Sequence, residues 1–474
     1  MPRKVILFEL NEVPWRIVDD YVERNPDSAL AGALARSHLY EAVAEDRGHL
    51  SPWTTWPSLH RGVNDETHMI GDLGQDRTKA DDLYPPVWQL LHEQGVSVGV
   101  CGSLHSFPPP DDITSYSFYL PDTFATSNEA HPPALSAFQE FNLLMARDSA
   151  RNVDTSIPLR AAARVLARSR GLGIRPDTYR AIAAQLLDER RQRWKSTRRR
   201  TFQAVLAFDA YFAQLDRTRP AFSTFFSNHV ASAMHRYWAA AHPGDYDEVG
   251  VDADWIDTYG GEITWAMQYA DRMLARLLRF ADRNPDYQVW VASSMGQGPT
   301  IAQGLETQVY LKDLPTFMRR LGIPDDGWEQ RPAMLPQTNV MVREDLRQDF
   351  EHKLGGLKMV SDPIHFRQSE SGFFAMDFGQ PNMHKRPTPL RYQGERLPLA
   401  EFGLEAVEIE DRSGTTAYHV PEGILFAYDP RSTEPVQDRA RVSALAVAPA
   451  LLRTFGVSPR EYMRSGDELT AVLS

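Results

Sequence analysis

The residues best suited to chemistry form one short stretch, His49–Ile70, which reads HLSPWTTWPSLHRGVNDETHMI. Thr54 and Thr55 place two hydroxyl groups directly before Trp56 and Pro57. Pro57 is typical of the first turn of a helix, where a residue without an N–H group is tolerated. A hydroxyl there faces unpaired backbone N–H groups and the positive end of the helix dipole, where a phosphoryl or sulfuryl group would bind. The alternative is that Thr54 or Thr55 only caps the helix.

This stretch resembles the nucleophile motif of the alkaline phosphatase superfamily, in the branch of type I phosphodiesterases and nucleotide pyrophosphatases. In that motif a Thr-aromatic-Pro run is followed, after a short helix, by Thr-Gly and then by His-Gly-Ile. Thr55-Trp56-Pro57 matches the first part, whereas Arg61-Gly62 and His68-Met69-Ile70 stand in place of the other two. The resemblance implies that the nucleophile is Thr55 rather than Thr54.

The resemblance also implies six metal-ligand positions besides the nucleophile, of which this chain keeps two. His235, within MHRYW, and His419, within GTTAYHVPEGI, match two histidines of the family. The other four positions hold residues that are poor metal ligands, namely Asn11, Ala231, Ser294 and Met295. The second metal site therefore has no charged ligand left, and we predict that it is lost and the metal centre degenerate. We expect at most one divalent metal ion, with zinc as the first candidate, at His235 and His419.

Three further residues bear on this reduced site. His229 lies two residues before the position of a missing Asp, so it could be a third metal donor, or the general base for Thr55 in a metal-free site. Asn11 and Ser294 would then bind the substrate. Glu9 shares a strand face with Asn11 and could replace the lost carboxylate. For two more histidines, His60 and His68, we favour structural roles.

The elements that must position these residues follow an α/β pattern. Short apolar runs followed by polar residues predict buried parallel strands that end at one edge of a sheet; these runs are Lys4–Leu10, Val96–Val100, Ala221–Ser227 and Tyr287–Ala292. Helices are predicted at Ile17–Arg24, Val87–Gln94 and Glu262–Ala281, and the tail from Val442 to Val457 resembles the closing helix of the family. We predict a three-layer α/β/α sandwich with a mostly parallel central sheet and inserted cap segments.

The same patterns divide the chain into a core and two insertions. Residues 1–122, 201–300 and 401–474 would form the alkaline-phosphatase-like core, residues 123–200 a helical insertion, and residues 301–400 a second insertion or cap. The basic stretch Glu189–Arg200, ERRQRWKSTRRR, could offer a phosphate-binding face, but a solvated helix face is the preferred interpretation.

Composition limits the function classes. The chain has 474 residues, 42% of them apolar, and a formal net charge of −12, which argues against binding to nucleic acid or anionic membranes. A single cysteine, Cys101, excludes an internal disulfide framework. The first apolar run is too short for a signal peptide and no run is long enough to span a membrane. We expect a soluble, cytoplasmic protein with a small-molecule substrate.

Three hypotheses follow. The first is a hydrolase or transferase that acts on phosphate-type esters through Thr55 with a one-metal site. The second is a metal-independent enzyme with His229 or His235 as base. The third is a catalytically inactive relative that binds a phosphorylated or glycosyl ligand in the old pocket. The retained Thr55, His235 and His419 favour an enzyme.

Overall fold

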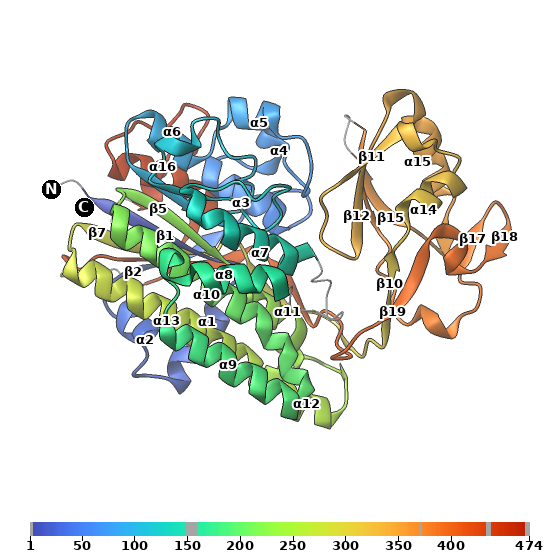
Figure 1. The fold of residues 1–474 in the computed structure, drawn as a ribbon, viewed down its shortest axis with the longest axis horizontal. Coiled ribbons are helices and arrows are strands. Elements are labelled where there is room, and N and C mark those ends of the chain that lie inside the picture. The colour runs from blue at the N-terminus through green and yellow to red at the C-terminus, as the bar shows by residue number, and fades with distance from the viewer. Residues whose placement is uncertain (1–2, 148–158, 369–371, 433–437, 470–474) are drawn as a thin grey trace.

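The computed structural model describes residues 3–147, 159–368, 372–432 and 438–469, which form a larger and a smaller lobe (Figure 1). The larger lobe contains an eight-stranded sheet with the spatial order β22 (Ala440–Ser443), β2 (Ser37–Val43), β21 (Glu422–Tyr428), β7 (Tyr287–Ala292), β1 (Lys4–Leu10), β5 (Phe222–Ser227), β3 (Val98–Cys101) and β4 (Phe118–Leu120). Only β21 runs antiparallel to its neighbours. The predicted α/β class with a mostly parallel sheet is confirmed.

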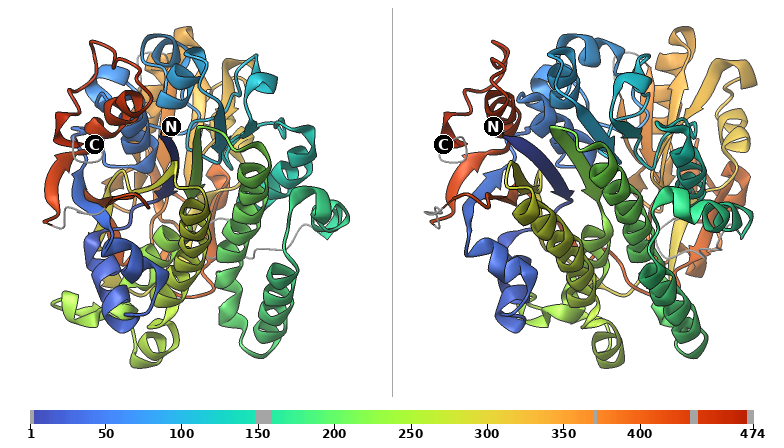
Figure 2. Two further views of the ribbon diagram at one scale, coloured as in Figure 1. Left: turned by 90° about the vertical axis from the view of Figure 1, so that its left-hand side faces the viewer. Right: turned by 60° about the vertical axis from the view of Figure 1, so that its left-hand side comes forward.

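Helices cover both faces of this sheet because the buried strands are apolar on both faces. On one face, Val5 and Leu7 of β1 pack in a cluster with α3 (Pro52–Arg61), α6 (Val87–Glu93) and α16 (Val447–Thr454). On the other face, Ile6 and Phe8 join a cluster with α1 (Trp15–Arg24), α2 (Ala29–Leu34), α7 (Ser136–Arg147), α8 (Leu159–Leu172), α10 (Arg199–Thr218), α11 (His229–Ala241), α12 (Ala253–Tyr259) and α13 (Glu262–Arg283). The larger lobe therefore has three layers, and Figure 2 shows α10 and α13 lying side by side over the sheet.

The smaller lobe, residues 307–408, has a hydrophobic core of its own. Its elements are β10 (Thr307–Leu311), α14 (Leu314–Arg320), β11 (Trp328–Arg331), β12 (Gln337–Val342), α15 (Arg347–Gly355), β13 (Lys358–Met359), β14 (Asp362–Pro363), β15 (His365–Gln368), β16 (Phe373–Asp377), β17 (Leu390–Tyr392), β18 (Glu395–Leu397) and β19 (Leu404–Glu408). The paired strands β10 and β19 enter and leave the lobe side by side. In contrast, α7 and α8 pack on the sheet of the larger lobe. We retain the predicted domain boundaries as a proposal.

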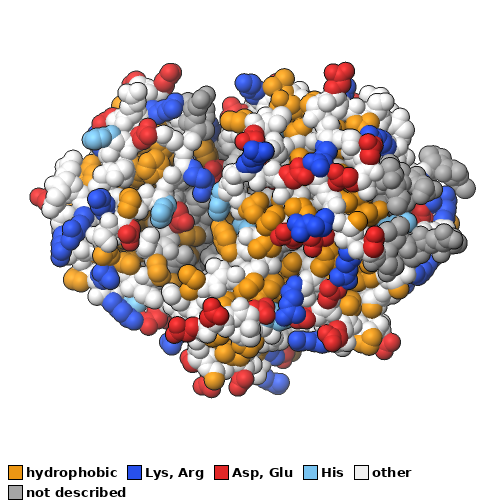
Figure 3. Space-filling model, turned by 180° about the vertical axis from the view of Figure 1, so that it is seen from behind, with side chains coloured by type: hydrophobic (Ala, Val, Ile, Leu, Met, Phe, Trp, Pro, Cys, Tyr) orange, Lys and Arg blue, Asp and Glu red, His pale blue; other side chains and the backbone are white. Residues whose placement is uncertain are grey.

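The surface carries no single-sign patch on the face seen in Figure 3, where acidic and basic side chains are intermixed over both lobes. The basic stretch is likewise paired with acidic partners. Arg198 donates to Glu262 at 2.9 Å and lies over the Trp265 ring, and Arg199 donates to Glu189 at 2.7 Å. Arg190, Arg191 and Arg193 are exposed, as a solvated helix face requires, whereas Arg198 and Arg199 are only partly exposed because they pack against their acidic partners. In the described part of the chain, no helix combines the length and apolarity needed to cross a membrane.

The helix that carries Thr55 begins earlier than predicted. It starts at Pro52, with the Ser51 hydroxyl accepting from the Trp53 N–H, so Thr55 lies within the first turns and is not the cap. Pro57 is inside the helix and cannot donate to the Trp53 carbonyl four residues before it. The imidazole of His105 replaces the missing donor, with Nε2 at 2.9 Å from that carbonyl oxygen. A residue distant in sequence thus allows proline in the middle of this helix.

Because His105 supplies the hydrogen bond that Pro57 cannot, the effects on stability of mutating these two residues should depend on each other. His105→Leu leaves the buried Trp53 carbonyl unpaired, and we expect it to lower the free energy of unfolding by about 1–3 kcal/mol. In a Pro57→Ala background the alanine N–H can bond that carbonyl, so the same change at His105 should cost measurably less. Urea unfolding of the four proteins measures the difference. Equal costs in both backgrounds would contradict the assigned role of His105.

Candidate metal and nucleophile site

The candidate site lies where several parallel strands end at one edge of the sheet, the usual position of sites in α/β proteins. Asn11 and Glu12 follow β1, Asn228 follows β5, and Ser294 follows β7. The N-terminal half of α3 brings Thr55 to the same edge. A short antiparallel pair, β8 (Gly296–Pro299) and β20 (Ala417–Val420), adds Gln297 and His419, and α11 adds His235.

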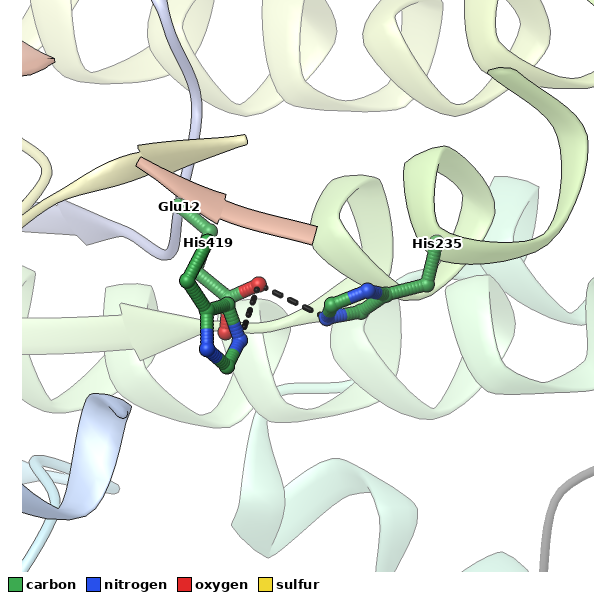
Figure 4. Close-up of side chains that lie close together, drawn as sticks. All are labelled: Glu12, His235 and His419. Atoms are coloured by element: carbon green, nitrogen blue, oxygen red, sulfur yellow. Dashed lines mark ion pairs between the residues drawn. The ribbon is translucent and has the colours of Figure 1, made fainter. Parts of the chain in front are cut away.

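Among the described residues, one group of side chains could together hold a metal ion: Glu12, His235 and His419. One donor atom from each lies within 4.8 Å of the others. The Glu12 Oε2 atom is 2.9 Å from Nε2 of His235 and 3.4 Å from Nε2 of His419. Figure 4 shows both imidazoles pointing at the carboxylate, one from α11 and one from β20. The two predicted metal histidines therefore meet, and a carboxylate lies between them.

Glu12 is almost fully buried and is surrounded by donors. Asn11 Nδ2 donates to Oε1 at 2.7 Å, and the Gln297 side-chain amide donates to Oε2. Burial alone would raise the pKa of Glu12, but the charges of His419 and His235 and their hydrogen bonds outweigh it and hold that pKa well below its usual value. Glu12 is therefore an ionised carboxylate inside the protein.

The tautomers of the two histidines are set by backbone carbonyl groups. His235 Nδ1 donates to the Ala417 carbonyl at 2.8 Å, and His419 Nδ1 donates to the Leu50 carbonyl at 2.6 Å. Each imidazole consequently presents Nε2 to Glu12, the arrangement that orients metal-bound histidines in proteins. One carboxylate and two oriented imidazoles are a suitable donor set for a divalent cation. These three residues fit the single metal ion that the sequence predicts.

The nucleophile candidate Thr55 contacts the predicted substrate-binding residue Ser294. Their hydroxyl oxygens are 2.8 Å apart, and Thr55 also donates to the Ser51 carbonyl at 3.2 Å. Because Thr55 has a single proton, Ser294 must be the donor of the shorter bond. The Ser51 carbonyl is adjacent in the chain to the Leu50 carbonyl that holds His419. Thr55 and the metal histidine are thus bonded to consecutive peptide groups.

Asn11 makes bonds that an Asp at the same position could not. Its amide nitrogen donates to Glu12 and to Asn228 Oδ1, both at 2.7 Å, and its Oδ1 accepts from Trp56 Nε1 at 2.7 Å. A carboxylate has no proton to donate to Glu12, and the two negative charges would repel each other. The amide at this position is therefore required by the carboxylate next to it.

His229 does not join the cluster, contrary to its predicted role as third donor or base. Its Nδ1 is 2.7 Å from the Ser227 hydroxyl and its Nε2 is 3.1 Å from the Ala266 carbonyl. Burial lowers its pKa to about 4, so the ring is neutral and engaged on both nitrogens. Glu9 does not replace the lost carboxylate either, since its Oε1 bonds His60 Nε2 at 2.7 Å in the core beneath α3.

Glu12 is the functional candidate that the sequence reasoning missed. The sequence comparison with the family puts the expected ligand position at Asn11, directly after β1. It gives no role to Glu12, the next residue. Its φ of 59° turns the backbone out of the extended conformation, so the alternation of side chains no longer applies there. A carboxylate one residue beyond the expected position, in a chain that keeps both histidines, was the available signal.

No protein-family model and no curated protein sequence matches the chain. Among solved structures, the murine ectonucleotide pyrophosphatase/phosphodiesterase 5 is similar at 10% identity and a TM-score of 0.45, covering 100% of both chains. The human protein of that name is 9% identical, with a TM-score of 0.43 and 99% of both chains covered. Phosphonoacetate hydrolase from Sinorhizobium meliloti 1021, in complex with phosphonoformate, is 13% identical, with a TM-score of 0.42 and 96% of both chains covered. At these identities the likeness does not define an activity, so function is inferred from the side chains of the site.

The geometry predicts one metal ion per chain, held by Glu12, His235 and His419. Protein dialysed against chelator and then titrated with zinc should bind about one ion, and Glu12→Gln or His235→Asn should weaken binding by at least about tenfold. Calorimetry measures both. His229→Gln is the matched control and should leave stoichiometry and affinity unchanged. Loss of zinc in the His229 variant alone, with Glu12→Gln unaffected, would show that the ligand set is different.

Proposed function

We propose that this protein is a hydrolase or transferase that acts on phosphate-type esters of small molecules, with Thr55 as nucleophile and one divalent metal ion at a reduced site. The observation that carries the proposal is the convergence of two groups at the same strand ends. Thr55 with Ser294 forms one group, and Glu12 with His235 and His419 forms the other. The Leu50 and Ser51 carbonyls connect them.

Thr55 needs help to act as a nucleophile, because a threonine hydroxyl is nearly always protonated at neutral pH. The bond donated by Ser294 supplies part of this help, since a hydrogen bond to the oxygen stabilises the deprotonated form. The Ser51 carbonyl orients the hydroxyl proton away from Ser294. His229 is not proposed as the base, because both of its ring nitrogens are hydrogen-bonded, one to Ser227 and the other to Ala266.

Glu12, His235 and His419 would hold the metal. A bound divalent ion would neutralise charge on the ester and lower the pKa of a coordinated hydroxyl or water. Zinc is our first candidate, because two imidazoles and one carboxylate are common zinc ligands. The positions of a second metal, Asn11 and Ser294 among them, provide only neutral groups, so we propose that no second ion binds.

One observation favours the alternative of a catalytically inactive protein that binds a phosphorylated or glycosyl ligand. Thr55 is only 1% exposed and Ser294 is fully buried, so the hydroxyl pair is tightly packed. In that case Thr55 would donate a hydrogen bond to an anion and would not attack it. Substitution of Thr55 separates the two functions.

If Thr55 is the nucleophile, Thr55→Ala should remove nearly all turnover of an activated aryl phosphate ester, whereas Thr55→Ser should keep part of it. If Thr55 only orients an anion, Thr55→Ala should weaken ligand binding by about 1–3 kcal/mol and leave any turnover measurable. Steady-state kinetics and calorimetry on the same preparations distinguish these results. Unchanged binding and turnover in Thr55→Ala would remove this residue from the mechanism.

The charge of the site predicts which esters react. One divalent ion and one carboxylate leave a single positive charge in excess, which balances a singly charged ester but not a doubly charged one. At pH 8, methyl p-nitrophenyl phosphate should therefore have a kcat/KM at least about tenfold higher than p-nitrophenyl phosphate, because an unbalanced charge in a buried site is costly. Release of p-nitrophenol measures both reactions. A preference for the monoester would mean that further positive charge is present.

A further inference from the structure

The smaller lobe contacts the larger lobe beside the helix that carries Thr55. The contact is made by the loop that follows α4 (Asp65–His68). Asn339 Nδ2 donates to the Leu73 carbonyl at 2.7 Å, Gln337 Nε2 donates to Asp72 at 3.3 Å, and Arg367 Nε donates to Asp72 at 3.2 Å. Figure 1 shows that β12 and β15, which carry these side chains, lie on the side of the smaller lobe that faces the larger one.

Arg367 is held at this contact but still has hydrogen-bond donors to spare. Its Nε and Nη2 atoms both bond Asp72, and Nη2 also donates to Gln337 Oε1 at 3.3 Å. Its Nη1 atom makes no hydrogen bond to any described residue. The Arg367 side chain is 46% exposed, whereas that of Asp72 is 11% exposed. The pair therefore fixes the guanidinium plane while one edge stays open to solvent.

Two aromatic residues lie against His419, one of the metal histidines. The Tyr418 ring stacks on His419 with centroids 4.2 Å apart, is 39% exposed, and has its hydroxyl 3.3 Å from His49 Nε2. The His49 ring is 6.4 Å from the His419 ring. Burial lowers the pKa of His49, and the positive charge of Arg367 is the next largest cause of that lowering.

Gly71, the residue before Asp72, accepts a hydrogen bond from the Thr54 hydroxyl at 3.3 Å. The pair of Arg367 and Asp72 therefore lies beside the helix that carries Thr55.

We propose that Arg367 binds a carboxylate on the organic part of the substrate, so that the smaller lobe selects among the esters that the Glu12 site accepts. This inference rests on the proposed function and assigns a specificity residue to it. The exposed ring of Tyr418, which stacks on His419, would support the organic group. A singly charged carboxylate suits the open edge of Arg367, whereas a doubly charged group would be repelled by Asp72. Asp72 is a positioning residue for the guanidinium.

The test compares two phosphonates that each carry one charge on phosphorus and differ only in the para substituent: the methyl ester of benzylphosphonate with a para carboxylate, and the same ester with a para carboxamide. Calorimetry with the full chain as purified gives the ratio of their dissociation constants. We expect the carboxylate to bind about three- to fivefold more tightly, the usual range for a half-exposed ion pair. Arg367→Gln should bring the ratio to about one, and Asp72→Asn should increase it because the arginine loses its counter-charge.

The opposite effects of Arg367→Gln and Asp72→Asn on the affinity ratio distinguish binding of the carboxylate by Arg367 from a role of the pair only in joining the two lobes. If the Arg367–Asp72 pair only joins the lobes, both variants will change the two affinities together and leave the ratio unaltered, which overturns the inference. Arg396→Gln, on the far strand β18, is the matched control and should behave as the unmodified protein. Absence of binding by both phosphonates would also overturn it. Turnover of aryl phosphate esters is measured separately, so failure of the proposed function is seen independently of this ratio.

Discussion

The ionised carboxylate of Glu12 is the constraint on which the arrangement of the site depends. A buried carboxylate costs several kcal/mol unless opposite charge and hydrogen-bond donors surround it. Here His235, His419, Asn11 and Gln297 all reach it. They come from α11, β20, the end of β1 and β8, which are far apart in sequence. Satisfying one charge therefore fixes how these elements meet, and Glu12 with its two histidines forms the donor set that could hold a cation.

The amide of Asn11 and the carboxylate of Glu12 depend on each other. An Asp at position 11 would face Glu12 with no proton to share, whereas Asn11 donates to it and accepts from Trp56. The described contacts therefore join Glu12 to the two histidines, whereas the side-chain partner of the Thr55 hydroxyl is the neutral Ser294.

Local sequence patterns predicted the sheet well and the site only in part. The bounds of β1 and β7 follow from short apolar runs alone, and their ends brought Ser294 to Thr55. Glu12 was missed for a local reason, its positive φ, whereas two other failures depend on residues distant in sequence. Pro57 sits inside α3 because His105 supplies the missing donor. His229, two residues from Ala231 on a helix, points to a different face and bonds Ala266.

The loop after α4 joins the nucleophile helix to the smaller lobe. The Thr54 hydroxyl donates to the Gly71 carbonyl at 3.3 Å, and two residues later the Leu73 carbonyl accepts from Asn339 of the smaller lobe. Thr54 is adjacent to Thr55, whose own hydroxyl is fixed by the Ser51 carbonyl. These two hydrogen bonds and the loop backbone between Gly71 and Leu73 therefore link the inserted lobe to the start of α3. Because the lobe has its own hydrophobic core, it can dock as a rigid unit on this loop, and its position and that of the nucleophile are determined by the same few contacts.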